Sequence, residues 1–235
     1  MCDDTASPPD GLVQIFVWDL HYWISLRSAT SNPRFVQEFR ISATFNAAPL
    51  QSVLDVWARA HDTVSDVAFA PYNQPLQTLL DLTSVFAQNH DGINILLVRW
   101  EDLGQIEKYG EAGLSQIEAN AQELVRAVRA ISSQMAVPLI FCVCPPSPKS
   151  GEVHQTFFDR LNDQMSACAE EASSVQYLDY RTIVEAYPIE SWDNPQGHER
   201  GRVPYTDSYF AALGSALLRM SLRLNHRPAE AISSR

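Results

Sequence analysis

The chain has 235 residues, of which 46% are hydrophobic and 19% are charged, a composition typical of globular proteins rather than disordered ones. It carries 17 Lys and Arg against 28 Asp and Glu, which gives a formal charge of −11. This acidity weighs against nucleic acids and anionic membranes as partners, because both require basic patches. The longest apolar stretch, Met135 to Cys144, is about half as long as a membrane span.

Targeting and cysteine patterns point to the same class of protein. The first residues, Met1–Thr5, are acidic where a secretory signal is basic, so we expect a soluble, cytoplasmic protein. The cysteines are too few for a disulfide framework at this size, and the single Cys-x-Cys pair at 142–144 has no second pair to complete a metal site. The sequence therefore predicts neither a metal nor another cofactor.

Hydrophobic patterning divides the chain into three parts. Residues 1–34 form an N-terminal extension with a polar start, predicted to be disordered, and an aromatic-rich segment at 11–34. That segment is either a helix closing one edge of the core or a surface for a partner, because exposed aromatic side chains dominate protein interfaces. Residues 35–225 form one α/β domain, and residues 226–235 form a flexible tail.

Strand and helix patterns alternate from residue 40 onward. In chain order they predict strand 40–45, helix 50–60, strand 63–69, helix 74–88, strand 93–98, helix 114–131, strand 138–143, helix 157–172, strand 175–178 and helix 208–222. The run Ile93–Val98 is almost entirely apolar, as in a strand buried on both faces. This alternation predicts an α/β fold with a five-stranded parallel sheet in a three-layer, doubly wound arrangement.

Polar side chains follow the carboxyl ends of the predicted strands and also occur in the long irregular stretch at 188–206. Ligands of open parallel sheets bind at this edge. We therefore expect one cleft lined by Asn73, Arg99, Glu101, Asp102, Asp179, Arg202 and Tyr205. Arg99, a cation ending a buried strand, either clamps a ligand or belongs to a structural ion pair with Glu101, Asp102 or Asp193.

Four segments carry a resemblance to a known family. They are Ser42–Leu50 (SATFNAAPL), Phe69–Asp81 (FAPYNQPLQTLLD), Asp91–Asp102 (DGINILLVRWED) and Pro204–Gly214 (PYTDSYFAALG). Together they resemble the SGNH-hydrolase-like domain found with FkbH-type and nonribosomal peptide synthetase proteins. The resemblance extends from about residue 39 to residue 222. It implies an SGNH-type or flavodoxin-like fold and a role in secondary-metabolite biosynthesis, on intermediates held by carrier proteins.

The sequence departs from the catalytic pattern of that family. An SGNH hydrolase requires a Ser after the first strand, an oxyanion hole, and an Asp and a His shortly before the last helix. Here the first strand is followed by no Gly-Asp-Ser, and only Ser42 and Thr44 carry a hydroxyl there. Arg202 occupies the expected position of the base, and a guanidinium group cannot take that role because it stays protonated near neutral pH. His198, with Asp193, is the remaining candidate base.

Three hypotheses of function follow. In the first, the chain handles an acyl or aminoacyl intermediate of natural-product assembly without a standard triad, alone or as one subunit of a heteromeric enzyme. Asn73, Arg99, Arg202 and Tyr205 then bind or orient an anionic or carbonyl group. In the second, it is an esterase or thioesterase with Ser42 or Thr44 as nucleophile and His198 as base. In the third, it is a non-catalytic docking domain for a carrier protein or synthetase. A protein partner that is basic or apolar is expected, because the chain itself is acidic.

Overall fold

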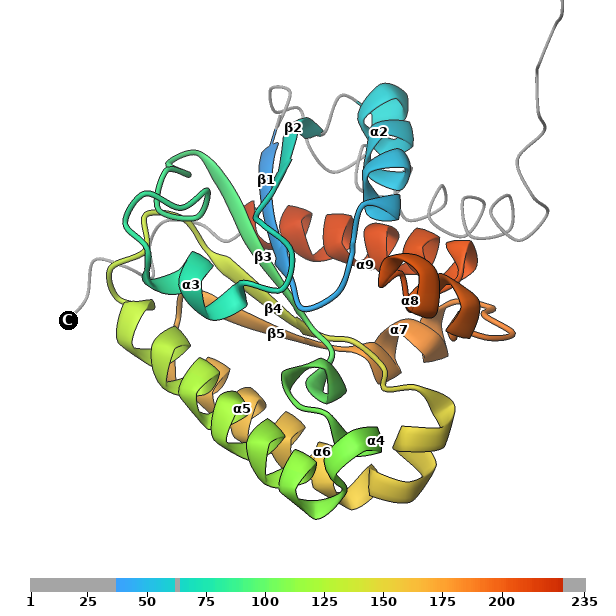
Figure 1. The fold of residues 1–235 in the computed structure, drawn as a ribbon. Helices are drawn as coiled ribbons and strands as arrows, with labels where there is room; N and C mark the ends of the chain where they lie inside the picture. The colour runs from blue at the N-terminus through green and yellow to red at the C-terminus, as the bar shows by residue number, and fades with distance from the viewer. Residues whose placement is uncertain (1–36, 62–63, 226–235) are drawn as a thin grey trace, which may run out of the picture.

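The computed structural model describes residues 37–61 and 64–225 (Figure 1). The aromatic-rich segment at 11–34 and the tail at 226–235, for which we predicted a partner surface or edge helix and a flexible end, lie outside the described residues.

A parallel sheet of five strands forms the centre of the domain. Its strands are β1 (Gln37–Ala43), β2 (Val64–Phe69), β3 (Gly92–Val98), β4 (Leu139–Val143) and β5 (Val175–Asp179). Their order across the sheet is β2-β1-β3-β4-β5, and every neighbouring pair is parallel. After β1 the chain forms β2 at one edge of the sheet. It then crosses back and adds β3, β4 and β5 in turn on the other side of β1. The topological switch point, where α/β sheets bind ligands, therefore lies between β1 and β3.

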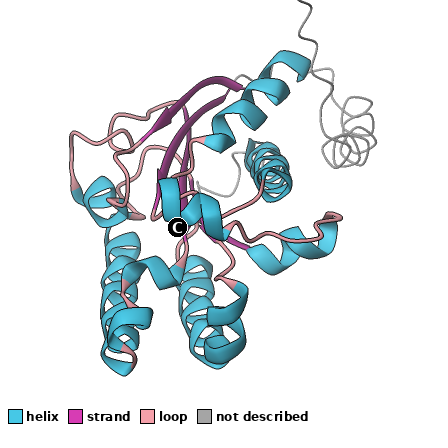
Figure 2. Cartoon of the chain, turned by 45° about the vertical axis from the view of Figure 1, so that its right-hand side comes forward, coloured by secondary structure: helices cyan, strands magenta, loops and turns pink. Residues whose placement is uncertain are grey.

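Helices cover both faces of the sheet, as Figures 1 and 2 show. One face packs against α2 (Pro49–His61), α7 (Tyr180–Ala186) and α9 (Asp207–Asn225), and the other against α3 (Pro75–Leu80), α5 (Glu111–Ile131) and α6 (Pro148–Glu171). The buried side chains form two apolar clusters, one on each side of the sheet. The predicted three-layer, doubly wound fold is thus confirmed.

Close packing between α2 and α9 depends on a small residue. A Cβ placed on Gly214 of α9 would lie 2.6 Å from Cγ1 of Val53 on α2, so a larger residue there would force the Val53 side chain or the helices to shift. Leu50 and Leu54, both fully buried, complete the contact from α2.

The predicted helix at 74–88 is wrong in its extent, since α3 ends at Leu80. The side chain of Asp81 accepts a hydrogen bond from the Thr83 backbone N–H at 2.8 Å, which forms a turn that competes with the helix. The Ser84 hydroxyl donates to the Thr78 carbonyl at 2.7 Å and so binds a carbonyl at the end of α3.

Several short elements were not predicted, and one long helix begins earlier than expected. α6 starts at Pro148 rather than 157, with non-helical backbone at His154. The unpredicted elements are the 3₁₀ helix η1 (Trp100–Leu103), α4 (Ile106–Tyr109), α7 and α8 (Pro195–Gly201). α8 lies inside the stretch predicted to be irregular, where the Asn194 side chain caps it by accepting from the Gly197 N–H at 3.0 Å.

In the part of the chain that the structure describes, none of the helices combines the length and the hydropathy that a bilayer-spanning helix needs.

Candidate functional site

The site is built where β1 and β3 end, at the switch point of the sheet. Thr44 follows β1, and its N–H donates to the carbonyl of Leu97 on β3 at 3.1 Å. Its hydroxyl accepts from the Arg99 N–H at 3.0 Å and donates to Oδ2 of Asp102 at 3.1 Å. This hydroxyl thus accepts one hydrogen bond and donates another inside the fold, and Thr44 is only 1% exposed. Thr44 therefore joins the two strand ends and fixes Asp102.

Arg99 is a buried cation whose charge is balanced by neighbouring carboxylates. Its side chain is 6% exposed and forms an ion pair with Glu101, while its Nε lies 3.8 Å from Oδ1 of Asp102. Glu101 also accepts from the N–H of Ser147 at 2.9 Å and from its hydroxyl at 3.1 Å. A buried cation that lacks a partner destabilises a fold by about 3–5 kcal/mol. The ion pair expected as an alternative for Arg99 is thus present.

The 3₁₀ helix η1 turns these carboxylates back toward the strand ends. Trp100 anchors it: the indole N–H donates to Oδ1 of Asn162 on α6 at 2.7 Å, and the ring packs 6.0 Å from the ring of Phe141. With Trp100 held beneath, Glu101 and Asp102 project from the same short turn into the site.

The long stretch after β5 brings a histidine to the other side of Arg99. Nδ1 of His198, on α8, lies 3.3 Å from Nη1 of Arg99. Asp193 pairs with Tyr205 through the backbone. Within residues 37–61 and 64–225, no hydrogen bond joins His198 to Thr44, Ser42 or Asp193, so the side chains of the predicted esterase triad are not linked.

Burial shifts the pKa values of two titratable groups near Arg99, Asp102 and His198, in the direction that favours their neutral forms. It raises the pKa of Asp102 to about 7, an effect that Glu101 reinforces and that Arg99, Thr44 and Arg202 oppose. Burial, together with the positive charges of Arg99 and Arg202, lowers the pKa of His198 below its usual range. A carboxyl group that titrates near neutral pH is suited to proton transfer.

Two residues in left-handed backbone conformation border the site. These are Asn73, with φ 54°, and Arg202, with φ 57°, and no other described non-glycine residue has a positive φ. The Asn73 N–H donates to the Ala43 carbonyl at 3.2 Å, and the Arg202 carbonyl accepts from the Asn46 N–H at 2.8 Å, so each is tied to the end of β1. Such strained residues cluster at functional sites.

Tyr72 belongs to the same neighbourhood but was not among the predicted site residues. It is 50% exposed. Burial of part of the ring and the charge of Asp102 raise its pKa, whereas Arg202 and Arg99 lower it, which places the phenol among these charges. Its position just before Asn73, after the second strand, was the available signal in the sequence.

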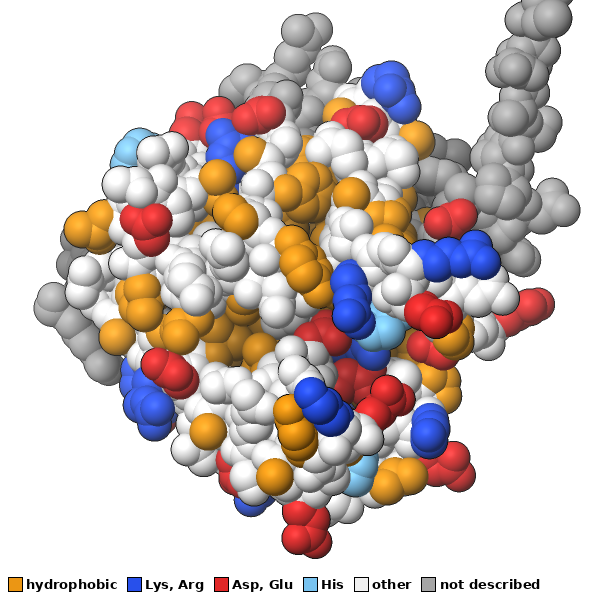
Figure 3. All heavy atoms as spheres, in the orientation of Figure 1, with side chains coloured by type: hydrophobic (Ala, Val, Ile, Leu, Met, Phe, Trp, Pro, Cys, Tyr) orange, Lys and Arg blue, Asp and Glu red, His pale blue; other side chains and the backbone are white. Residues whose placement is uncertain are grey.

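A cavity of about 240 Å³ opens beside Asp102, between α3, η1 and α5. Its lining consists of Asn73, Pro75, Leu76, Gln77, Asp102, Leu103, Asn120, Glu123 and Leu124. Figure 3 shows the face concerned: the surface between α3 and α5 is hollowed over apolar side chains, and acidic, basic and histidine side chains gather next to it. The predicted residues Asn73 and Asp102 thus meet in one cavity next to the Arg99 network.

Solved structures of similar fold are known, at low sequence identity. The N-terminal part of protein BF1531 from Bacteroides fragilis, which contains a phosphatase domain and was solved with Mg, aligns with a TM-score of 0.66 at 13% identity. The match covers 87% of this chain and 57% of that one, so this chain spans little more than half of the solved N-terminal part. Two catalytic mutants of Axe2, an acetylxylan esterase from Geobacillus stearothermophilus, align with TM-scores of 0.48 and 0.47 at 11% and 12% identity, over 78% of this chain and 93% of theirs.

No model of a protein family matches the sequence, and no curated protein is significantly similar to it. The likeness to the BF1531 structure agrees with the three-layer α/β fold described above.

Three predicted side chains do not line the cavity beside Asp102. Ser42 is fully buried, and its hydroxyl donates to Oγ1 of Thr78 at 3.2 Å. Tyr205 is 2% exposed and donates to the Pro145 carbonyl at 2.8 Å, beneath the site rather than lining it. Asp179 is bound by Arg181 at the start of α7 and is not among the residues that line the cavity beside Asp102.

Metal-binding geometry is absent from the described ranges, where no three His, Cys, Asp or Glu side chains are grouped to hold an ion.

Proposed function

We propose that this chain binds an acyl-type intermediate of secondary-metabolite assembly at the switch point and handles it without a Ser-His-Asp triad. The observation that carries the proposal is the cavity beside Asp102, which adjoins the polar network of Arg99, Glu101 and His198. Pockets with an apolar floor and a few convergent polar groups are typical of small-molecule sites.

Arg202 is the side chain best placed to meet the carbonyl or anionic end of such a ligand. It is exposed, it influences the pKa of Asp102, His198 and Tyr72, and it forms no salt bridge with any described residue. Arg99, by contrast, is already paired with Glu101. Arg99 therefore holds the carboxylates in place while Arg202 contacts the ligand.

A protein partner belongs to the proposal, because within the described residues His198 is hydrogen-bonded to neither Ser42 nor Thr44, and the Thr44 hydroxyl, which contacts Asp102, is buried. A partner subunit completes the site, or a carrier protein presents the acyl group. If the chain binds a carrier protein but no free acyl thioester, it is a docking domain instead.

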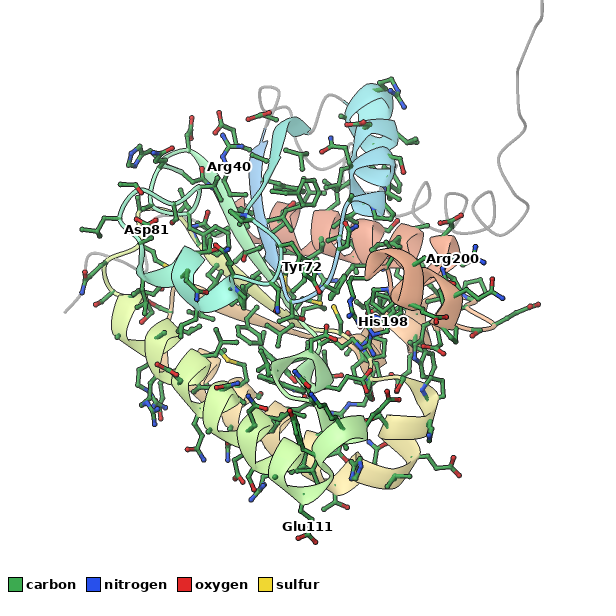
Figure 4. The ribbon with its side chains drawn as sticks, in the orientation of Figure 1. Arg40, Tyr72, Asp81, Glu111, His198 and Arg200 are labelled. Carbon is green, nitrogen blue, oxygen red and sulfur yellow. The ribbon has the colours of Figure 1, made fainter. Side chains whose placement is uncertain are left out.

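Calorimetric titration with acyl and aminoacyl thioesters of N-acetylcysteamine, which mimic carrier-bound groups, tests the proposal. We expect binding that Arg202→Gln weakens by roughly tenfold, the effect of one lost charged hydrogen bond. Arg200→Gln is the matched control: it removes the same charge two residues earlier in α8, at the outer side of the molecule in Figure 4, and should change nothing. Absence of binding by every thioester contradicts the proposal.

A second candidate, an esterase with Thr44 as nucleophile, is favoured by one contact. The Thr44 hydroxyl donates to Asp102, a carboxyl group whose pKa of about 7 suits a general base. Its burial argues against attack on a substrate. We expect little hydrolysis of a chromogenic ester; efficient hydrolysis that Thr44→Val abolishes would establish the esterase in place of our proposal.

A further inference from the structure

The ionisable side chains that line the cavity beside Asp102 are all acidic. Two acidic side chains, Asp102 and Glu123, contribute to its wall, and no Lys, Arg or His does so among the described residues. Three amides, on Asn73, Gln77 and Asn120, add donors and acceptors. A charged group that enters this space finds complementary charge only if it is a cation.

The remaining lining and the size of the cavity limit what accompanies that cation. Pro75, Leu76, Leu103 and Leu124 give an apolar floor, which suits an aliphatic side chain. The volume of about 240 Å³ lies below the range of drug-sized ligand pockets, so the group is small. Asn120 is held in place, because its side-chain N–H donates to the Leu103 carbonyl at 2.6 Å, which leaves its amide oxygen for a ligand.

Asp102 belongs both to the acidic cavity and to the neighbourhood of two arginines. It lines the cavity, its Oδ1 lies 3.8 Å from Nε of the paired Arg99, and the exposed Arg202, which does not line the cavity, lowers its pKa. A ligand with an ammonium group next to a carbonyl matches this order, with the ammonium in the cavity and the carbonyl toward Arg202. An acyl group without the ammonium leaves Glu123 and the amides without a polar partner from the ligand.

We propose that the cavity is an ammonium-binding subsite that selects an aminoacyl group with a small aliphatic side chain over the corresponding acyl group. This inference rests on the proposed function and specifies its substrate class. Glu123, on α5, is the specificity-determining residue that only this inference requires, because it contacts neither Arg99 nor Thr44.

A matched pair of ligands tests the selection directly. The valyl and 3-methylbutanoyl conjugates of N-acetylethylenediamine differ only by the ammonium group, and their amide linkage in place of a thioester prevents turnover. Titrated into the full chain, the valyl conjugate should bind at least about tenfold more tightly, as expected for a charge-assisted hydrogen bond.

Two variants assign the effect to the cavity. Glu123→Gln should bring the affinity for the valyl conjugate close to that for the 3-methylbutanoyl conjugate. Glu111→Gln removes the same charge from the first residue of the same helix, which Figure 4 shows far from the site, and should leave the preference intact. Both positions are exposed, so folding is not expected to change.

The outcomes separate this inference from the proposed function. Equal affinities, tighter binding of the 3-methylbutanoyl conjugate, or a preference that survives Glu123→Gln overturns the ammonium subsite while acyl binding stands. Binding of neither conjugate overturns both.

Discussion

The raised pKa of Asp102 predicts how the stability of the protein depends on pH. Because burial raises this pKa from its ordinary value of 3.8 to about 7, the native state binds more protons than the unfolded state between these two values. The contribution of Asp102 to stability is therefore fully present below about pH 4 and is lost as the pH rises to about 7. The variant Asp102→Asn carries no titrating group there and removes this dependence.

The size of the effect follows from the part of the shift that lies in an accessible pH range. From pH 5 to pH 7 the native carboxyl group changes from protonated to half-ionised, while the unfolded one is almost fully ionised. At about 1.4 kcal/mol per pH unit, the wild-type protein therefore loses roughly 2 kcal/mol relative to the variant. The side chain of Asp102 is only 13% exposed, so solvent screening leaves most of this difference. The lowered pKa of His198 acts in the opposite direction, but it does so in both proteins and largely cancels in the comparison.

Urea unfolding of both proteins at pH 5, 6, 7 and 8 measures the difference. The unfolding free energy of Asp102→Asn minus that of the wild type should rise steadily across the series and level off above pH 7. Asp163→Asn, which removes an exposed carboxyl group from α6, controls for the general effect of one lost charge. Parallel profiles for wild type and Asp102→Asn would refute the reasoning that burial keeps this carboxyl group protonated.

Three further substitutions test the fold around the site, each by urea unfolding at neutral pH. Arg99→Met should cost about 3–5 kcal/mol, because it leaves two partly buried carboxylates without their cation; a cost below 1 kcal/mol would show that the ion pair adds little. Ser42→Ala should destabilise the fold by only about 1 kcal/mol, because it removes one hydrogen bond to Thr78, and it should leave ligand affinity unchanged. Loss of ligand binding would show that Ser42 takes part in the site. Gly92→Ala should destabilise by at least about 1–3 kcal/mol, since its Cβ would lie 2.1 Å from the Glu38 carbonyl oxygen; a stable variant would mean that β1 and β3 can separate locally.

The strands and the fold class follow from the sequence alone. The almost continuous apolar run at 93–98 belongs to a strand buried on both faces, and β3 is indeed buried along nearly its whole length. Alternation of such runs with helical patterns leaves few arrangements other than a doubly wound parallel sheet, because parallel strands require crossover connections. The carboxyl ends of the strands, and hence the approximate place of a site, follow from the same argument.

What the sequence did not determine is which polar side chains at that edge face one another. Ser42 and Thr44 are two residues apart on the same strand end, yet Ser42 is buried against Thr78 whereas Thr44 holds Asp102. The difference arises because Ser42 lies within β1 beside Leu96 of β3, whereas Thr44 lies past the end of β1, where Arg99 and Asp102 follow β3.

The contacts of the late loop were likewise decided by tertiary structure. A one-turn shift in α8 would carry His198 away from Arg99, and the position of α8 depends on a side-chain cap at Asn194 and on backbone bonds to the end of β1. Local patterning determines elements because hydrophobic periodicity is a property of neighbouring residues. The contact between Arg99 and His198, and the cavity walled by α3 and α5, arise only when distant segments pack, because they depend on distances that no local pattern encodes.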